Sequence, residues 1–290
     1  MSASPQVEAS GPAVEPAAIE PAAPPAAAQG VTVEVQRWER GHTVLASDQV
    51  AQEAPVAILY EGVPHVVMLA SPADLIDYAY GFTVSEELVA TPAEIRSVEV
   101  RAAQEATEVH VSIAWERFPE LLRRRRNLTG RTGCGLCGAE TLPEAIRGRA
   151  RIGTGPRVSA AELHRAIDEL GSRQPLNART GSVHAAAWVI PGEGIYCVRE
   201  DVGRHNALDK AIGALLRAGL DLDRGYMLVT SRASYEMVQK AATVGIAMLA
   251  ALSAPTSLAI RHAERSGLTL VAFARRDRHV VYAHPQRLAP

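Results

Sequence analysis

The stretch GYMLVTSRASYEMVQKAATVGIAMLAALS, residues 225–253, predicts a strand, a helix and a second strand in succession. GYMLVT is a short apolar run typical of a buried strand, and the polar SRAS predicts a turn. YEMVQKAATVG predicts a helix, and IAMLAALS predicts another buried strand. This order is typical of a layered α/β domain in which helices cover a mostly parallel sheet.

The alternation continues on both sides of this stretch. On its N-terminal side, Ser159 and Glu162 form a capping box before the helical run LHRAIDEL. VHAAAWVI and IYCVRE then predict a strand pair, and NALDKAIGALL has helical spacing. On its C-terminal side, TSLAIRHAERSG predicts a helix, and LTLVAFA and HVVYAH predict two strands. We therefore expect residues 158–290 to form one α/β domain.

A smaller α+β domain is expected over residues 31–120. VTVEVQRW alternates like a strand, two strands flank the turn at Glu61 and Gly62, and EIRSVEVRA and TEVHVSIAW predict another pair. Ser71 is expected to cap a helix that runs to about Tyr80.

Two segments lie outside these domains. Residues 1–30 are rich in Ala and Pro and have no hydrophobic periodicity, which predicts a disordered tail. Residues 121–157 contain a basic run and a glycine-rich loop that carries two cysteines. We expect this loop to be flexible because glycine is conformationally permissive.

The composition narrows the class of protein. The 290 residues are 47% hydrophobic and carry a formal net charge of -2. Neither this charge nor the aromatic content of 4% favours nucleic-acid binding. No apolar run reaches the ~18 residues of a membrane helix, and the N-terminus lacks the basic region of a secretory signal. A soluble, cytoplasmic protein without membrane contact is expected.

Cys134 and Cys137 lie in the loop LTGRTGCGLCGAE, residues 128–140. A metal clip, a redox disulfide and a sulfur carrier are all possible. One CxxC supplies only two of the four ligands of a structural zinc site, so no metal site is predicted. The surrounding glycines disfavour the helix that a thioredoxin-type pair begins. They suit a loop that carries a thiol between sites, and Arg131 would favour its thiolate. A surface loop with incidental thiols is the remaining alternative.

Polar residues follow two predicted strands at the starts of helices. A strand that runs into a helix presents free N–H groups at the carboxyl edge of a sheet, where anionic ligands bind. Helix caps and a solvated arginine would explain the same residues without a ligand. The candidate ligand-binding residues at these two starts are Ser231, Arg232, Ser234, His205 and Asn206.

A third candidate segment, FARRDR, lies between the last two predicted strands. Arginine binds phosphate bidentately, so this tip suits a phosphate clamp, although a basic hairpin tip can also be merely solvated. Its residues are Phe273, Ala274, Arg275, Arg276, Asp277 and Arg278.

Taken together, RTGCGLCG, REDVGRHNALDKAIG, VTSRASYEMVQKAA, SAPTSLAI and LTLVAFAR…VYAHPQRL resemble the signatures of the FdhD family. These are the accessory sulfurtransferases of formate dehydrogenase, and the resemblance extends from about residue 31 to the end. It implies that a cysteine desulfurase loads a persulfide on Cys134, with Cys137 as its helper. The sulfur would then pass to the molybdenum cofactor, as Mo-bis(molybdopterin guanine dinucleotide), before insertion into formate dehydrogenase. Residues 273–278 match the cofactor-binding segment of the family.

The resemblance also implies a cytidine deaminase-like fold for the second domain. The H-x-E and P-C-x-x-C motifs of zinc deaminases are absent, so deamination is not expected. A homodimer is expected because the two dinucleotides of the cofactor are themselves related by two-fold symmetry. A molybdenum-cofactor chaperone without sulfur transfer and a zinc-bound regulatory protein are the alternatives.

Overall fold

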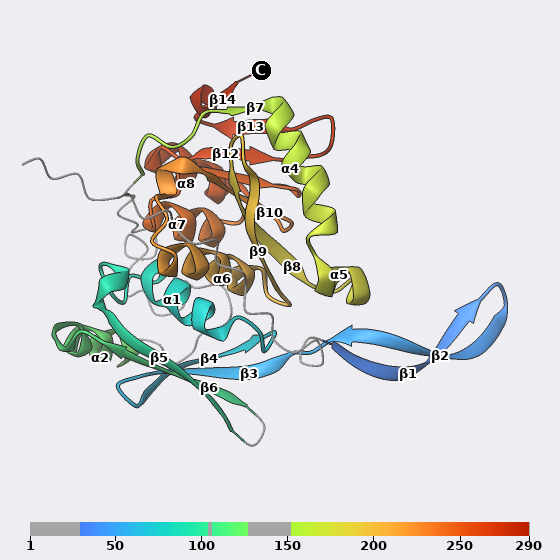
Figure 1. Cartoon of the computed structure of the whole chain (residues 1–290), viewed down its shortest axis with the longest axis horizontal. Helices are drawn as coiled ribbons and strands as arrows, with labels where there is room; N and C mark the ends of the chain where they lie inside the picture. The colour runs from blue at the N-terminus through green and yellow to red at the C-terminus, as the bar shows by residue number, and fades with distance from the viewer. Residues whose placement is uncertain (1–29, 104–105, 127–151, 290) are drawn as a thin grey trace, which may run out of the picture.

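The computed structural model describes residues 30–103, 106–126 and 152–289. They form an N-terminal unit on a four-stranded sheet, a C-terminal unit on a six-stranded sheet, and a separate hairpin that extends from the N-terminal unit (Figure 1). None of the helices within these ranges is long and apolar enough to cross a membrane.

The six-stranded sheet has the strand order β13-β12-β11-β10-β8-β9. Only β10–β11 and β11–β12 pair in parallel, and the other three pairs are antiparallel. The prediction of a mostly parallel sheet is therefore wrong. The reason is that β8–β9 and β12–β13 are joined by short turns, which permit only antiparallel pairing, and that β10, which follows β9 through α6, pairs with β8 rather than with β9. The six strands are β8 (His184–Ile190), β9 (Gly194–Asp201), β10 (Tyr226–Val229), β11 (Met248–Ala251), β12 (Thr269–Ala272) and β13 (Val280–Ala283).

Helices cover both faces of this sheet, as the predicted layered α/β architecture requires. Trp188, Met227 and Leu249 point to one face and pack with α6 (Arg204–Arg217), α7 (Tyr235–Thr243) and α8 (Ser257–Ser266). Their neighbours Val189 and Leu228 point to the other face and pack against α4 (Ala160–Ser172). The short α5 (Pro175–Thr180) was not predicted. The capping box of Ser159 and Glu162 at the start of α4 is confirmed.

The four-stranded sheet of the N-terminal unit has the order β4-β3-β6-β5 and is covered on one face by α1 (Leu75–Ser85). Val56, Ile58 and Val109 of the sheet pack with Tyr78 and Phe82 of α1. All four strands were predicted. They are β3 (Ala54–Tyr60), β4 (Val63–Ala70), β5 (Ile95–Ala102) and β6 (Thr107–Ile113), and α2 (Phe118–Arg126) follows them.

The predicted cap of α1 is wrong. The helix begins at Leu75 after Asp74, whose φ of 53° is left-handed, and it extends to Ser85 rather than to Tyr80. Ser71 instead binds the other unit: its N–H donates to Asp201 Oδ2 at 3.0 Å, and its Oγ accepts from the N–H of Val202 at 3.2 Å. The hydroxyl is therefore used between units rather than within the helix.

The hairpin of β1 (Gly30–Glu39) and β2 (His42–Ala51) forms a two-stranded sheet of its own. Of its strands, β1 was predicted and β2 was not. The remaining short elements are η2 (Pro92–Glu94), η3 (Trp115–Arg117), η4 (Leu222–Arg224), η5 (Pro285–Arg287) and the parallel pair β7 (Val158–Ser159) and β14 (Leu288–Ala289).

The two units meet where α1 crosses α6. A Cβ on Gly81 would lie 1.7 Å from the carbonyl oxygen of Asp209, and one on Gly213 would lie 1.8 Å from that of Asp77. Only glycine allows the two backbones to approach this closely. This contact fixes α6, and therefore the start of α6, against the N-terminal unit.

Candidate functional site

Three turns lie side by side at the carboxyl edge of the parallel strands β10, β11 and β12. Ala233 N–H donates to Ala254 O, and Thr256 N–H donates to Ala233 O, both at 3.1 Å. Phe273 N–H donates to Ser253 O at 3.1 Å. We call residues 230–234, 252–256 and 273–278 the carboxyl-edge turns. The structure thus brings together the two predicted segments around Ser231 and Phe273, which are about forty positions apart in the sequence.

The first of these turns leads into α7. Ser231 is buried, and its Oγ donates to the carbonyl of Arg232 at 3.1 Å, while the Arg232 side chain is exposed. Ser234 is the N-cap residue of α7, but its side chain makes no capping hydrogen bond. The first N–H groups of α7 therefore face the edge together with an arginine, an arrangement that favours an anion.

The third turn begins with Phe273, which is 42% exposed and has a left-handed φ of 49°. Ala274 is buried, and its N–H donates to Ala251 O at 3.1 Å, which fixes the turn to β11. The guanidinium of Arg275 donates to the carbonyl of Leu252, in the neighbouring turn. The residues 275–278 that follow are all exposed.

The charged residues of this segment differ in their contacts. Arg276 Nε donates to Asp168 Oδ1 of α4 at 2.6 Å, a surface pair of small energetic value. The carbonyl oxygen of Arg278 accepts a hydrogen bond from the N–H of Arg275 at 2.8 Å, which closes the turn. The side chains of Arg275, Asp277 and Arg278 lie at the surface. Residues 275–278 contain three arginines and one aspartate and therefore carry a net positive charge.

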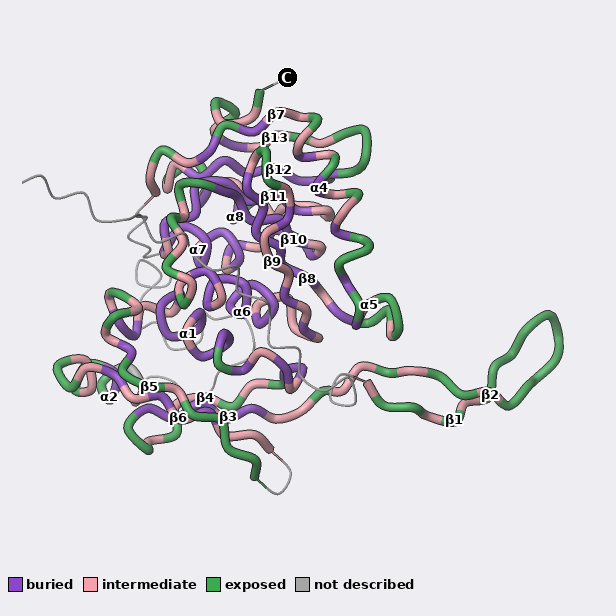
Figure 2. The backbone as a smooth tube through the Cα atoms, viewed as in Figure 1, coloured by how far each residue is buried: buried purple, intermediate pink, exposed green. Residues whose placement is uncertain are grey.

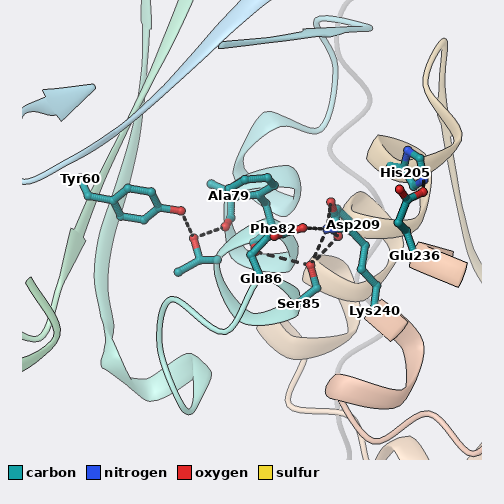
Figure 3. A network of polar contacts seen from close by, with 10 residues as sticks. Tyr60, Ala79, Phe82, Ser85, Glu86, His205, Asp209, Glu236 and Lys240 are labelled. Carbon is teal, nitrogen blue, oxygen red and sulfur yellow. Dashed lines mark hydrogen bonds and ion pairs between the residues drawn. The ribbon is translucent and has the colours of Figure 1, made fainter. Parts of the chain in front are cut away.

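His205 connects the second predicted helix start to the first. Its Nε2 lies 2.8 Å from Glu236 Oε2, so the first turns of α6 and α7 are in contact (Figure 3). His184 lies nearby at the start of β8, and burial and the charge of Arg204 lower its pKa. The buried Nε of Arg204 has no hydrogen-bond partner among the described residues. An anion at the start of α6 would satisfy this donor.

Sequence reasoning did not select Glu236 or His184 as site residues. Glu236 resembles any acid in the first turn of a helix, and His184 resembles a histidine buried in the core. The only available signal was that each of two predicted strands runs into a polar helix start. These strands, β9 and β10, are not neighbours in the sheet, because β8 lies between them. That signal places a site but does not tell which side chains meet there.

Asn206 has a different position from the other candidates. It is 3% exposed, and its Nδ2 donates to Leu69 O at 2.8 Å and to Asp201 Oδ1 at 3.0 Å. Asp201 in turn pairs with the fully buried Lys210 at 2.5 Å. Asn206 therefore belongs to the interface between the two units.

A buried ion cluster holds the helices behind the site. Lys240 Nζ of α7 lies 2.9 Å from Asp209 Oδ2 of α6, 2.9 Å from Ser85 Oγ and 2.7 Å from Glu86 Oε1 (Figure 3). Burial alone would lower the pKa of Lys240, but the carboxylates of Asp209 and Glu86 outweigh it and raise that pKa. The lysine therefore stays charged and joins α7 to α6 and α1.

Cys134, Cys137 and Arg131 lie outside the described residues. Cys197 of β9 packs against the core, and burial raises the pKa of its thiol to about 11. It is therefore protonated at neutral pH, as expected for a structural cysteine. Within the ranges that the structure describes, no three His, Cys, Asp or Glu side chains are grouped to hold a metal ion.

Comparison with known proteins tests the resemblance seen in the sequence. The model of the FdhD/NarQ family matches residues 51–289. The chain belongs to the FdhD/NarQ family. This family member is 49% identical over 277 residues to the sulfur carrier protein FdhD of Cupriavidus necator, a match that covers 96% of this chain and 95% of that protein. It is 50% identical over 254 residues to the protein of the same name from Xanthomonas campestris pv. campestris, which covers 88% and 90%.

A solved structure has the same fold as this FdhD/NarQ family member. The crystal structure is of a Desulfotalea psychrophila protein assigned as an accessory to formate dehydrogenase. It superposes with a TM-score of 0.70 over 90% of this chain and 99% of that one, at 24% identity. The predicted mixed α/β architecture is thereby confirmed.

Proposed function

We propose that this protein is a sulfur carrier that moves persulfide sulfur from a cysteine desulfurase to the molybdenum cofactor before the cofactor enters formate dehydrogenase. Membership of the family and the curated relatives, which are sulfur carriers by name, support the carrier role. The observation that carries the proposal is the meeting of residues 230–234 and 273–275 at one basic edge of the sheet. The cofactor is the substrate of this edge.

The carboxyl-edge turns suit the phosphates of a bis(molybdopterin guanine dinucleotide). The exposed guanidinium groups of Arg232, Arg275 and Arg278 can donate to phosphate oxygens in pairs. The N–H groups at the start of α7 add neutral donors and a positive helix end. Phe273 offers an exposed aromatic ring at the same edge, against which a base or pterin ring can stack.

The sulfur reaction itself belongs to the two loop cysteines. The thiolate of Cys134 attacks the terminal sulfur of the desulfurase persulfide, the S–S bond there breaks, and the desulfurase cysteine leaves as a thiolate. Cys134 then carries the extra sulfur atom. Attack by Cys137 on the inner sulfur forms a Cys134–Cys137 disulfide and releases hydrosulfide for the cofactor. This step oxidises the dithiol by two electrons, and a thiol reductant of the cell restores it.

The chain between α2 and the next described residue, Ile152, allows this transfer. Residues 127–151 number 25, and a chain of that length spans up to about 80 Å when extended. Its length therefore does not prevent the cysteines from serving two partners. We further propose that the protein acts in the cytoplasm as a homodimer, each copy presenting one edge to one half of the cofactor.

Mass spectrometry tests the carrier against the chaperone. The purified protein is incubated with a cysteine desulfurase and cysteine, and the peptide containing Cys134 and Cys137 is weighed. A gain of one sulfur atom supports the carrier. An unchanged mass, with the cofactor still bound by the protein, would favour a chaperone that binds the cofactor without transferring sulfur.

A further inference from the structure

The β1–β2 hairpin lies apart from the two units. Figure 1 shows it extending beyond the N-terminal sheet, and it meets α5 near its base, where Gly30 lies beside Thr180 and β2 also contacts α5. Nearly all of its residues are exposed or half-buried in Figure 2. Because an isolated two-stranded hairpin is at best marginally stable in water, such an arm gains from being covered.

The strand register gives the arm two unlike faces. Val31 pairs with Val50, Val33 with Asp48, Val35 with Ala46 and Arg37 with Val44, and these four rows lie on one face, which ends at the tip with the polar row of Glu39 and His42. Six of the eight side chains in the four rows before the tip are apolar. The rows between them lie on the opposite face, where six of eight side chains are polar: Thr32, Glu34, Gln36, Thr43, Ser47 and Gln49, beside Leu45 and Trp38.

The apolar face is open to solvent. Val31, Val44 and Val50 are 46%, 48% and 40% exposed, respectively. On the opposite face Leu45 and Trp38 are more exposed, at 78% and 71%, but they lie among polar side chains near the tip. Contiguous exposed apolar side chains on a protein usually mark a contact surface. We call the face formed by Val31, Val33, Val35, Val44, Ala46 and Val50, with Arg37 and Asp48, the arm face.

We propose that the arm face binds the arm face of a second copy of this chain, antiparallel and across a two-fold axis at the Val35–Ala46 row. Within the four rows before the tip, one acidic and one basic side chain favour this partner. Asp48 lies one row from the axis toward the base, and Arg37 lies one row from it toward the tip. Antiparallel packing of two arms therefore brings Arg37 of each copy into the same row as Asp48 of the partner subunit, twice per dimer.

This arrangement also fits the shape of the molecule. Each strand of ten residues is about 33 Å long. Antiparallel arms place the two bodies at opposite ends, where they do not collide. A symmetric contact of this kind is self-complementary, as the interface of a two-fold dimer must be. The inference specifies the surface of the proposed homodimer and does not depend on sulfur transfer.

The first test is the molar mass of the full-length protein in solution, measured by light scattering over a dilution series. Val35→Glu places two carboxylates near each other at the axis, and we expect it to raise the dimer dissociation constant by about tenfold or more. Gln36→Glu adds the same charge one position away, on the opposite face, and is expected to leave the dissociation constant unchanged. Circular dichroism melts verify that both variants are folded.

The second test exchanges the charges and stays informative if Val35→Glu disturbs the hairpin. Arg37→Asp and Asp48→Arg alone each create two like-charge contacts per dimer, and we expect each to weaken association about tenfold. The double variant restores both ion pairs with the two charges exchanged. Its dimer dissociation constant should be close to that of the unchanged protein.

Each outcome decides the inference. A stable dimer that Val35→Glu leaves intact, or single charge reversals that the double variant does not rescue, would overturn the arm contact while the homodimer stands. A protein that is monomeric throughout the dilution series would overturn both. Neither result bears on the gain of a sulfur atom by the cysteine peptide, so a failure here is distinct from a failure of the carrier proposal.

Discussion

His205 Nε2 lies 2.8 Å from Glu236 Oε2, and this pair ties the first turn of α6 to the first turn of α7. Each helix follows a different strand of the six-stranded sheet, so the pair connects the two helix starts, in addition to the Lys240–Asp209 ion pair between the same helices. Both side chains are mostly buried, with exposed fractions of 20% and 17%. The alignment of the proposed anion-binding edge therefore depends on a contact between residues 31 positions apart in the sequence.

The pair should have a measurable coupling energy. In a double-mutant cycle of His205→Ala and Glu236→Gln, we expect about 1 kcal/mol of coupling in the free energy of unfolding, because both side chains are mostly buried. Urea unfolding of the four proteins measures it. Strict additivity of the two single changes would mean that the contact does not fix the helix starts.

Arginines of the carboxyl-edge turns should control nucleotide affinity. We expect Arg232→Ala and Arg278→Ala each to weaken the binding of guanosine diphosphate by about tenfold, because each variant loses a charge-assisted hydrogen bond to phosphate. Isothermal titration calorimetry measures the effect. Arg224→Ala is the matched control, since Arg224 is a surface arginine paired with Glu193 away from this edge. Equal losses of nucleotide affinity in all three variants would mean that this edge does not bind the nucleotide.

Glycine at the helix crossing should be essential for stability. Gly81→Ala and Gly213→Ala place a Cβ less than 2 Å from a carbonyl oxygen of the other helix. We expect each to cost about 3 kcal/mol or more in the free energy of unfolding. Gly171→Ala in α4 meets no atom within 4 Å and should instead stabilise by about 0.5–1 kcal/mol. Thermal unfolding of the three variants measures the difference. Similar melting temperatures for all three would contradict the close approach of α1 and α6 at Gly81 and Gly213.

Acidification should weaken the C-terminal unit. Burial lowers the pKa of His262, which is 5% exposed and packs on Tyr235 with a ring separation of 4.9 Å. The unfolded chain takes up a proton as the pH falls through about 6.5, while the folded chain takes it up only at lower pH. Stability is therefore fully present above pH 6.5 and declines as the pH falls through this window.

The measurement for this prediction is the urea midpoint at pH 7.5 and pH 5.5. His262→Gln removes the titrating group and should lose less stability between the two values than the unchanged protein. His42→Gln, at the exposed start of β2, is the control and should behave like the unchanged protein. An identical loss in the His262 variant would exclude this histidine as a cause.

Much of the fold could be predicted because its strands and helices have clear periods. The strands around Trp188 and Met227 are short apolar runs, and the helix after Ser159 carries its own cap. The direction of β10 relative to β8 could not be predicted, since an apolar run is the same in either direction and β10 does not follow β8 directly in the chain. The strand β2 was missed because Ser47, Asp48 and Gln49 interrupt its apolar positions in an arm that makes few contacts.

The candidate site was predicted as a set of segments and not as a set of contacts. Motifs placed Ser231 and Phe273 near one edge, and the hydrogen bonds of the intervening turn at Ser253 and Ala254 join them. Ser71 and Asn206 have the local patterns of a helix cap and a helix start, but both bind the opposite unit. Only tertiary packing could decide their partners.

The central claim is that Cys134 carries the sulfur while the carboxyl-edge turns bind the cofactor. The most direct measurement is the activity of formate dehydrogenase matured in cells that contain only the Cys134→Ala variant, together with guanine nucleotide binding by that variant. We predict a folded variant with unchanged nucleotide affinity and an inactive formate dehydrogenase. Full formate dehydrogenase activity with Cys134→Ala would contradict the claim.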